Sequence, residues 1–155
     1  MSDIVILQRL LLSTCIAGAI GYEREHRGRA AGFRTHILVG IGSCLAMLTG
    51  IYLMDASALG VAVDPTRIAA QVVSGIGFLG AGTIIRSRAS IRGLTTAAGL
   101  WAVGGIGLAA GAGFIRGAVF SGAMVIIVLF GFSRFEHMIR REEAKETGGS
   151  ERSQR

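Results

Sequence analysis

One group of residues that could carry chemistry lies between the first two hydrophobic stretches of the chain. It contains two carboxylates and several basic side chains: Glu23, Arg24, Glu25, Arg27, Arg34 and His36. Mg²⁺ prefers carboxylate ligands and usually retains some of its waters, so the two glutamates are candidate ligands for this ion. Glu23 also precedes Arg27 by four residues, the spacing of an ion pair on a helix. The group therefore predicts either a site for an ion or a protein partner, or a basic loop that contacts anionic lipid.

A second group of polar residues lies inside or beside the later hydrophobic stretches. It consists of Asp64, Arg67, Gln71, Ser74, Thr95 and Thr96. The three from Arg67 to Ser74 follow the i, i+4, i+7 spacing of one helix face. Polar residues in membrane helices either form hydrogen bonds to neighbouring helices or mark a path for an ion. Both interpretations stay open at this point.

No arrangement typical of a catalytic centre accompanies these groups. The sequence has no nucleophile–base pair, no zinc-ligand spacing and no phosphate-binding loop. The net charge of +6 would suit a nucleic-acid partner, but most of the basic residues lie in short clusters between hydrophobic runs. We therefore expect neither an enzyme nor a nucleic-acid-binding protein.

The elements that must hold these residues are five hydrophobic stretches, each near the length of about 20 residues that crosses a bilayer. Backbone groups in lipid must be satisfied within the segment, so the stretches are predicted to be helices. They are Ile4–Gly21, Ile37–Met54, Ile68–Ile85, a run within Gly93–Ile115, and about Gly117–Ser133. The fold class is thus an all-α, polytopic membrane protein. We expect a membrane domain over residues 1–133 and a charged, partly disordered cytoplasmic tail over residues 134–155.

The basic residues predict how this bundle is oriented. Thirteen of the 16 Lys and Arg residues follow the first, third or fifth stretch, and these alternate connections share one side of the membrane. The positive-inside rule places that side in the cytoplasm. We therefore expect the N-terminus outside and the C-terminus inside, with Asp64 on the opposite side from Glu23. Asp64 and Pro65 suit the N-cap and first position of the third helix.

Glycine is unusually frequent, with 24 of 155 residues. A G-x-G-x-x-G pattern begins at Gly75, but a dinucleotide fingerprint needs a preceding strand and a later acidic residue, and this pattern lies in an uncharged hydrophobic run. Two interpretations remain: close packing of helices, or a locally unwound third helix whose carbonyls could face an ion. The glycines concerned are Gly75, Gly77, Gly80 and Gly82, together with Gly107 and Gly111 at small-xxx-small spacing.

Several stretches carry a resemblance to a known family. They are Gly21–Glu25, Gly32–Val39, Asp64–Gly82 and Gly93–Ala98, followed by Trp101. Over about residues 5 to 130 the chain resembles the membrane domain of the MgtC/SapB family. The resemblance implies a multi-pass bacterial inner-membrane protein with five spans and an outside N-terminus. Many members also carry a soluble C-terminal ACT-like domain, which this chain is not expected to have.

The resemblance also implies a function. Family members are linked to growth in low magnesium and to virulence, and some act as regulators that restrain the F-type ATP synthase. We therefore expect a non-catalytic regulator of membrane energetics, with membrane lipids, a membrane protein such as the synthase, and a second copy of the chain as partners. The alternative is a transporter or channel for Mg²⁺, the one cofactor or substrate ion that the sequence suggests.

Overall fold

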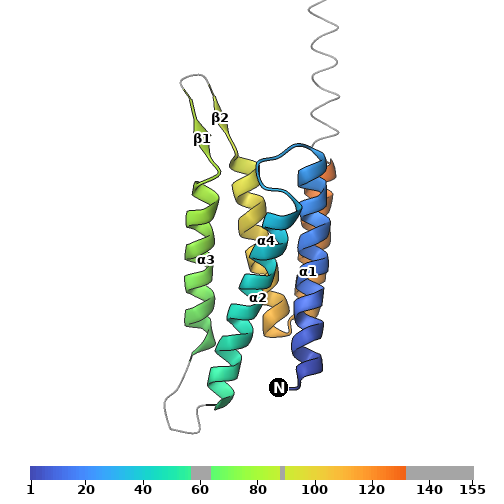
Figure 1. Cartoon of the computed structure of the whole chain (residues 1–155), viewed down its shortest axis with the longest axis vertical. Helices are drawn as coiled ribbons and strands as arrows, with labels where there is room; N and C mark the ends of the chain where they lie inside the picture. Colours follow the sequence, from blue (N-terminus) through green and yellow to red (C-terminus); the bar gives the residue numbers. More distant parts are fainter. Residues whose placement is uncertain (57–63, 88–89, 132–155) are drawn as a thin grey trace, which may run out of the picture.

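The computed structural model describes residues 1–56, 64–87 and 90–131, and in these ranges the chain is built almost entirely from helices (Figure 1). The helices are α1 (Asp3–His26), α2 (Phe33–Ala56), α3 (Pro65–Ala81) and α4 (Leu94–Ala112). A further helix, Ile115–Gly131, follows a left-handed turn at Gly113 and is called the fifth helix below. The predicted helical fold is confirmed, and α1, α2 and α4 are long and apolar enough to cross a membrane.

The first two helices are longer than predicted, which shortens the connection between them to residues 27–32. The prediction of a polar loop from Glu23 to His36 was therefore wrong, because both ends of that segment are helical. The Glu23–Arg27 ion pair supports the last turn of α1. At the start of α2 the Glu25 carboxylate accepts a hydrogen bond of 2.8 Å from the backbone N–H of Phe33. The first polar group thus lies mainly on helices.

The third helix ends earlier than the predicted boundary at Ile85. α3 stops at Ala81, and the chain then forms a short antiparallel hairpin of β1 (Ile85–Arg86) and β2 (Ile91–Arg92). The Thr83 hydroxyl donates to the carbonyl of Gly80 at 2.7 Å and satisfies a group at the end of the helix. Gly93, at φ +92°, closes the hairpin so tightly that a Cβ there would lie 2.0 Å from the oxygen of Thr83. The strictly all-α prediction therefore missed this small hairpin.

The start of α3 agrees with the prediction. Asp64 is the N-cap, and its carboxylate accepts hydrogen bonds from the backbone N–H and the hydroxyl of Thr66, at 2.9 and 2.7 Å. These two hydrogen bonds hold the pKa of Asp64 below its usual value. Pro65 follows in the first turn, where its missing N–H costs nothing.

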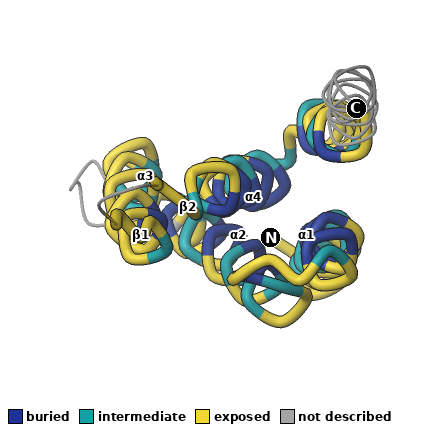
Figure 2. The backbone as a smooth tube through the Cα atoms, turned by 90° about the horizontal axis from the view of Figure 1, so that it is seen from above, coloured by how far each residue is buried: buried dark blue, intermediate teal, exposed yellow. Residues whose placement is uncertain are grey.

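The bundle is organised around the contact between α2 and α4, which lie side by side in its middle (Figure 2). A Cβ at Gly107 would lie 2.5 Å from the oxygen of Gly40, and one at Gly111 would lie 2.5 Å from the oxygen of Cys44. The two backbones therefore approach to a distance that only glycine permits. At these two glycines α2 and α4 are therefore closely packed.

The remaining helices attach to this central pair. On one side Ile76 of α3 packs on Gly104 of α4, and a Cβ added to Gly104 would lie 2.0 Å from the Cδ1 atom of Ile76. On the other side α1 packs against α2, with Ala17 over Gly40. The fifth helix rests on α1 through Ile16, which occupies the space beside Gly122. Arg9 of α1 donates a hydrogen bond of 2.7 Å to the oxygen of Gly111 near the end of α4.

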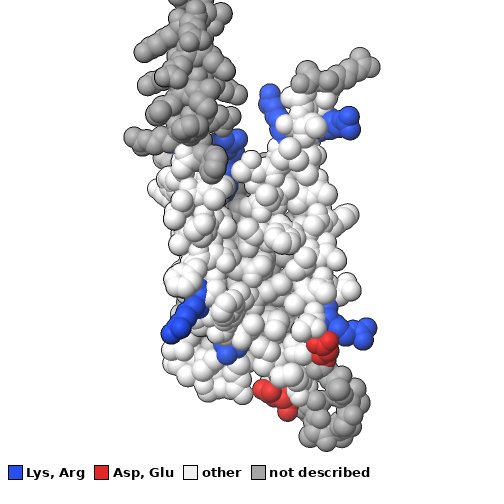
Figure 3. Space-filling model, turned by 180° about the vertical axis from the view of Figure 1, so that it is seen from behind, with Lys and Arg blue, Asp and Glu red and all other residues white. Residues whose placement is uncertain are grey.

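Charged side chains gather toward the two ends of the bundle and leave its middle apolar (Figure 3). This distribution is the one expected of helices that cross a hydrocarbon layer. The predicted tail, residues 134–155, and the end of the predicted fifth span at Ser133 lie outside the described residues.

The close contact of α2 and α4 predicts that a single methyl group at its centre will destabilise the protein. We expect Gly107→Ala to lower the free energy of unfolding by about 1–3 kcal/mol, because the two backbones must separate. Gly105→Ala is a matched control, since Gly105 is exposed and a Cβ there meets nothing within 4 Å. It should leave stability unchanged or raise it by up to about 1 kcal/mol. Unfolding in mixed detergent micelles measures both; equal losses would contradict the packing account.

Candidate functional site

Buried polar side chains gather at the end of the bundle where α1 ends and where α2 and α4 begin. Glu23, Arg24, His36 and Thr96 are each no more than 3% exposed, although they come from three helices. Arg27, just after α1, is partly buried beside them. We call these five residues the polar cluster. It brings together most of the first predicted group and one threonine of the second.

Glu23 is the centre of the polar cluster. One of its carboxylate oxygens accepts a hydrogen bond of 2.5 Å from Nε of Arg24, and the other pairs with Nε of Arg27. Two guanidinium groups around one carboxylate give these three residues a formal charge of +1. Burying charges is costly unless they are paired, so the carboxylate is what allows Arg24 to be buried. Both Glu23 oxygens are thereby engaged by cations.

Arg27 ties the polar cluster to the fifth helix. Its guanidinium carbon lies 5.6 Å from the centre of the Phe130 ring, within the range of a cation–π interaction. Sequence reasoning missed Phe130, because nothing in its local pattern relates it to a residue about a hundred positions earlier. The contact links the last described turn of the chain to the end of α1.

His36 lies where α1, α2 and α4 meet, and it is fully buried. Its Nδ1 atom is 2.8 Å from the oxygen of Gly32. A carbonyl can only accept, so Nδ1 carries the proton and Nε2 is left as an acceptor. Nε2 has no hydrogen-bond partner among the described residues, and it lies 3.6 Å from the position that a Cβ of Gly99 would take. His36 also packs closely on Gly21, because a Cβ added to Gly21 would lie 2.9 Å from the Cβ of His36.

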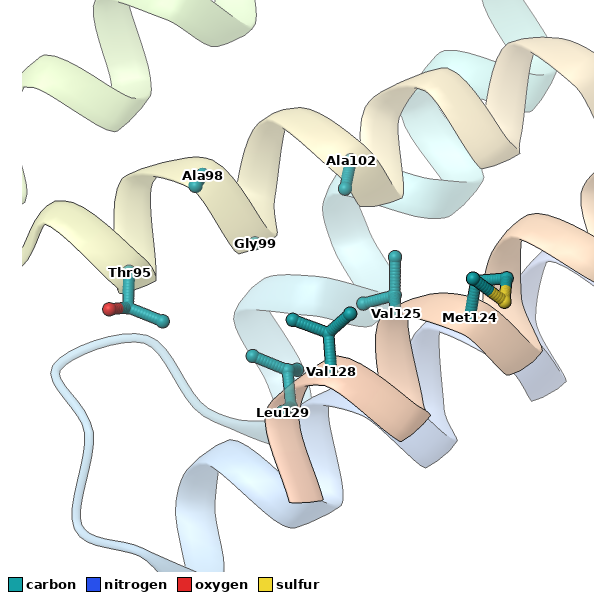
Figure 4. A pocket seen from close by; sticks show the side chains of 8 residues that line it. All are labelled: Thr95, Ala98, Gly99, Ala102, Met124, Val125, Val128 and Leu129. Atoms are coloured by element: carbon teal, nitrogen blue, oxygen red, sulfur yellow. The ribbon is translucent and has the colours of Figure 1, made fainter. Parts of the chain in front are cut away.

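The two threonines of α4 point to different surroundings. Thr96 is buried, whereas Thr95 is exposed and lines an apolar groove of about 280 Å³ between α4 and the fifth helix. Figure 4 shows that valine, leucine and methionine side chains of the fifth helix form the opposite wall of this groove. Thr95 is the only polar residue among those lining the groove.

The other predicted site residues lie outside the polar cluster. Arg34 is exposed on the first turn of α2. The stripe on α3 is also exposed along its length, with Arg67, Gln71 and Ser74 all on the outer side of the bundle. Asp64 caps α3 at the opposite end from α1's last turn (Figure 1). The structure therefore separates the predicted residues into a buried cluster and an exposed helix face.

The glycines of α3 do not have one common environment. Gly75 and Gly77 are exposed, and a Cβ at either meets nothing within 4 Å. Gly80 is buried against Ala97 of α4, and Gly82 is the C-cap. The helix is continuous through Gly75, Gly77 and Gly80, so the unwound segment considered from the sequence is not observed.

The carboxylates suggested as Mg²⁺ ligands lie in different settings. Glu23 is buried between arginines, whereas Glu25 is exposed and hydrogen-bonded to the start of α2. Within residues 1–56, 64–87 and 90–131, no group of three or more His, Cys, Asp or Glu side chains could hold a metal ion. The charges of the polar cluster are instead paired with one another, which stabilises the end of α1.

Helices long and apolar enough to cross a membrane, joined around a buried and net-positive polar cluster, define a polytopic helical membrane protein. The model of the MgtC family matches residues 10–138, which is most of the chain. The protein therefore belongs to the MgtC family. No solved structure matches the chain significantly.

Two curated relatives show what the chain is similar to. It is 46% identical over 123 residues to a protein of Escherichia coli K12 named "Putative magnesium transporter YhiD", covering 78% of this chain and 57% of that one. It is 48% identical over 88 residues to "Protein MgtC" of Salmonella typhimurium LT2, covering 56% of this chain and 35% of that one. The matches thus span little more than half of YhiD and about a third of MgtC.

The polar cluster predicts that neutralising Glu23 will be strongly destabilising. In Glu23→Gln the shape is kept, but the buried Arg24 loses its counter-charge, so we expect a loss of about 3–5 kcal/mol in unfolding free energy. Glu25→Gln is the matched control: that residue is exposed, and an amide oxygen can still accept from Phe33. Thermal unfolding of both variants in detergent checks this. A Glu23→Gln protein as stable as the control would show that the pair is not needed.

Proposed function

We propose that this protein is a non-catalytic regulator of the bacterial inner membrane that acts through helix contacts with another membrane protein. The target that fits the family resemblance is the F-type ATP synthase, whose restraint would adjust membrane potential and pH when magnesium is scarce. The observation that carries the proposal is the exposed side of α3, which has the features of a contact surface within lipid.

This surface, called the α3 face below, consists of exposed residues on one side of the helix: Arg67, Gln71, Ser74, Gly75, Gly77 and Phe78. The opposite side of α3 is held to the bundle through Ile76 and Gly80, which are its buried residues. Phe78 is 85% exposed, the highest value among the large hydrophobic residues that the structure describes. One side of α3 therefore anchors the helix, and the other faces outward along its whole length.

The composition of the α3 face favours a helix partner over lipid. Gln71 has no hydrogen-bond partner among the described residues, and an amide facing hydrocarbon carries a desolvation cost. A hydrogen bond across helices offsets that cost, with a value of roughly 0.6–2 kcal/mol. Gly75 and Gly77 would let a second backbone come close, because no side chain projects from them. A polar group with small neighbours is therefore suited to a specific helix contact.

The same face could serve a second copy of the chain as well as a different protein. We propose that the protein forms a homo-oligomer or a hetero-complex through this face. A helix partner of either kind would satisfy Gln71 and use the open glycines.

The alternative function is transport of Mg²⁺, and the name of the YhiD relative favours it. Two features weigh against it: α3 is continuous through Gly75 and Gly77, so no unwound carbonyls face an ion, and both oxygens of Glu23 are engaged by arginines. Purified protein in liposomes loaded with a magnesium-sensitive dye separates the functions. A flux above that of empty vesicles, lost in Gln71→Leu, would favour transport.

Regulation through the α3 face predicts that filling an open glycine there will abolish the effect on ATP synthesis. We expect Gly75→Leu to fold normally, because a Cβ at that position meets nothing within 4 Å. It should lose co-purification with the synthase and restore proton-driven ATP synthesis in inverted vesicles to the level without the protein. The physical reason is that a leucine side chain prevents close approach of a partner helix.

Gly42→Leu is the matched control for this experiment. Gly42 of α2 is also exposed with nothing within 4 Å of a Cβ, but it lies on another helix. This variant should still co-purify and still restrain synthesis. If wild-type protein leaves ATP synthesis unchanged, the synthase is not its target; if both variants behave alike, the α3 face is not the contact surface.

We further propose that the end of the bundle that carries the hairpin faces the cytoplasm, in agreement with the distribution of basic residues. In the Cys15→Ser, Cys44→Ser background, Ser90→Cys in the hairpin should react with a membrane-impermeant maleimide only in inverted vesicles. Thr66→Cys, at the start of α3, should react only in cells made permeable in the outer membrane. The reverse labelling pattern would show that the hairpin faces the opposite side and would contradict the proposed topology.

A further inference from the structure

A groove on the outer side of α1, which borders the polar cluster at Phe130, has the features of a binding site. Its floor is formed by the small residues Cys15, Gly18 and Ala19, and its walls by Ile37 of α2 and Ile126 of the fifth helix. The groove has a volume of about 610 Å³, within the range of sites that hold small molecules. It is hollow because small side chains on α1 lie between larger ones on the two neighbouring helices.

Aromatic rings surround the end of this groove nearest the basic side of the bundle. Tyr22, Phe33 and Phe130 all line it there. Tyr22 stacks on His26 with ring centres 6.2 Å apart. Aromatic side chains that combine an apolar ring with a polar group are enriched at the depth of the lipid headgroups. The groove therefore runs from the apolar part of the bundle to the level at which headgroups lie.

A second, more polar hollow continues the groove beyond these rings. It is lined by Tyr22, Glu25, His26 and Phe33, and it shares Tyr22 and Phe33 with the groove. The Glu25 carboxylate in this hollow already accepts the N–H of Phe33. We call this hollow the mouth of the groove. An apolar groove with a polar mouth has the shape required by an amphiphile with one acyl chain and one polar headgroup.

The charge of the chain segment that forms this mouth favours one kind of lipid headgroup. Arg29, in the short connection, and Arg34, on the first turn of α2, are both exposed and form no ion pair with any described residue. Arg34 precedes Ile37 of the groove wall by three positions, so the two lie on one side of α2. The chain segment from Tyr22 to Ile37, which supplies the lining of this mouth, carries four arginines and two glutamates, a formal charge of +2. A phosphate without a compensating amine fits this charge best.

We propose that this groove binds one molecule of an anionic phospholipid. An acyl chain lies along Cys15, Gly18 and Ala19, and the phosphate lies at Arg29 and Arg34. A zwitterionic lipid would place its ammonium beside two arginines and only one, already hydrogen-bonded, carboxylate. Bound lipid would connect α1, α2 and the fifth helix at the level of the polar cluster. This proposal is independent of the proposed regulatory function.

Native mass spectrometry of the purified full chain tests the proposal, after release from vesicles of equal parts phosphatidylglycerol and phosphatidylethanolamine with matched chains. Wild-type protein should retain one phosphatidylglycerol in preference to phosphatidylethanolamine. Ala19→Phe fills the floor and should lower this retention by about fivefold or more, since the acyl chain loses its buried area. Arg29→Gln and Arg34→Gln should each lower the preference by about fivefold, the usual effect of one basic residue at an anionic surface.

Matched substitutions elsewhere serve as controls. Ala70→Phe adds the same ring to an exposed position of α3, and Arg86→Gln and Arg92→Gln remove exposed arginines from the hairpin. All three should retain phosphatidylglycerol as wild type does, and circular dichroism should show unchanged helix content in every variant. Equal retention of the two lipids by wild type, or full retention in Ala19→Phe, would overturn the proposal. Loss in the controls as well would reduce the effect to non-specific attraction and would also overturn it.

Discussion

The close approach of α2 and α4 holds the bundle together. Lipid removes the hydrophobic force that would drive helices together in water, so backbones must come near enough for dispersion and weak polar contacts to act. Gly107 and Gly111 permit this, since a Cβ at either would lie 2.5 Å from a carbonyl oxygen of α2. Gly40 extends the contact to α1, and Gly104 extends it to α3 through Ile76. Four helices are thus joined through a few positions that carry no side chain.

This packing also explains where the polar residues lie. Because α1 and α2 also meet closely at Gly21, His36 is enclosed by three helices, and Glu23 and Arg24 are buried beside the same junction. The charges survive there because Glu23 is paired on both oxygens. On α3, by contrast, only Ile76 and Gly80 are buried, and Gln71 and Ser74 remain on the outside. A tightly built centre thus leaves one helix face available to a partner.

Much of the fold could be predicted from the sequence, but the candidate site could be predicted only in part. Long apolar runs indicate membrane helices, and Asp64 with Pro65 identifies the start of α3, because these signals are local. The small-residue spacing of Gly107 and Gly111 likewise indicated a packing surface. The hairpin after α3 was missed because the uncharged run continues to Ile85, and the close approach at the base of the hairpin depends on Gly93, eight residues further on. The contact of Arg27 with Phe130 and the burial of His36 depend on how distant helices meet, which no local pattern records.

Photo-crosslinking in living cells can show whether the α3 face contacts another helix within the membrane. A photoactivatable amino acid at Phe78, which is 85% exposed on the α3 face, is compared with one at Leu45, which is 51% exposed on α2. We expect a discrete protein crosslink from position 78, identifiable by mass spectrometry as a subunit of the synthase or a second copy, and only lipid adducts from position 45. Lipid adducts alone at both positions would contradict it.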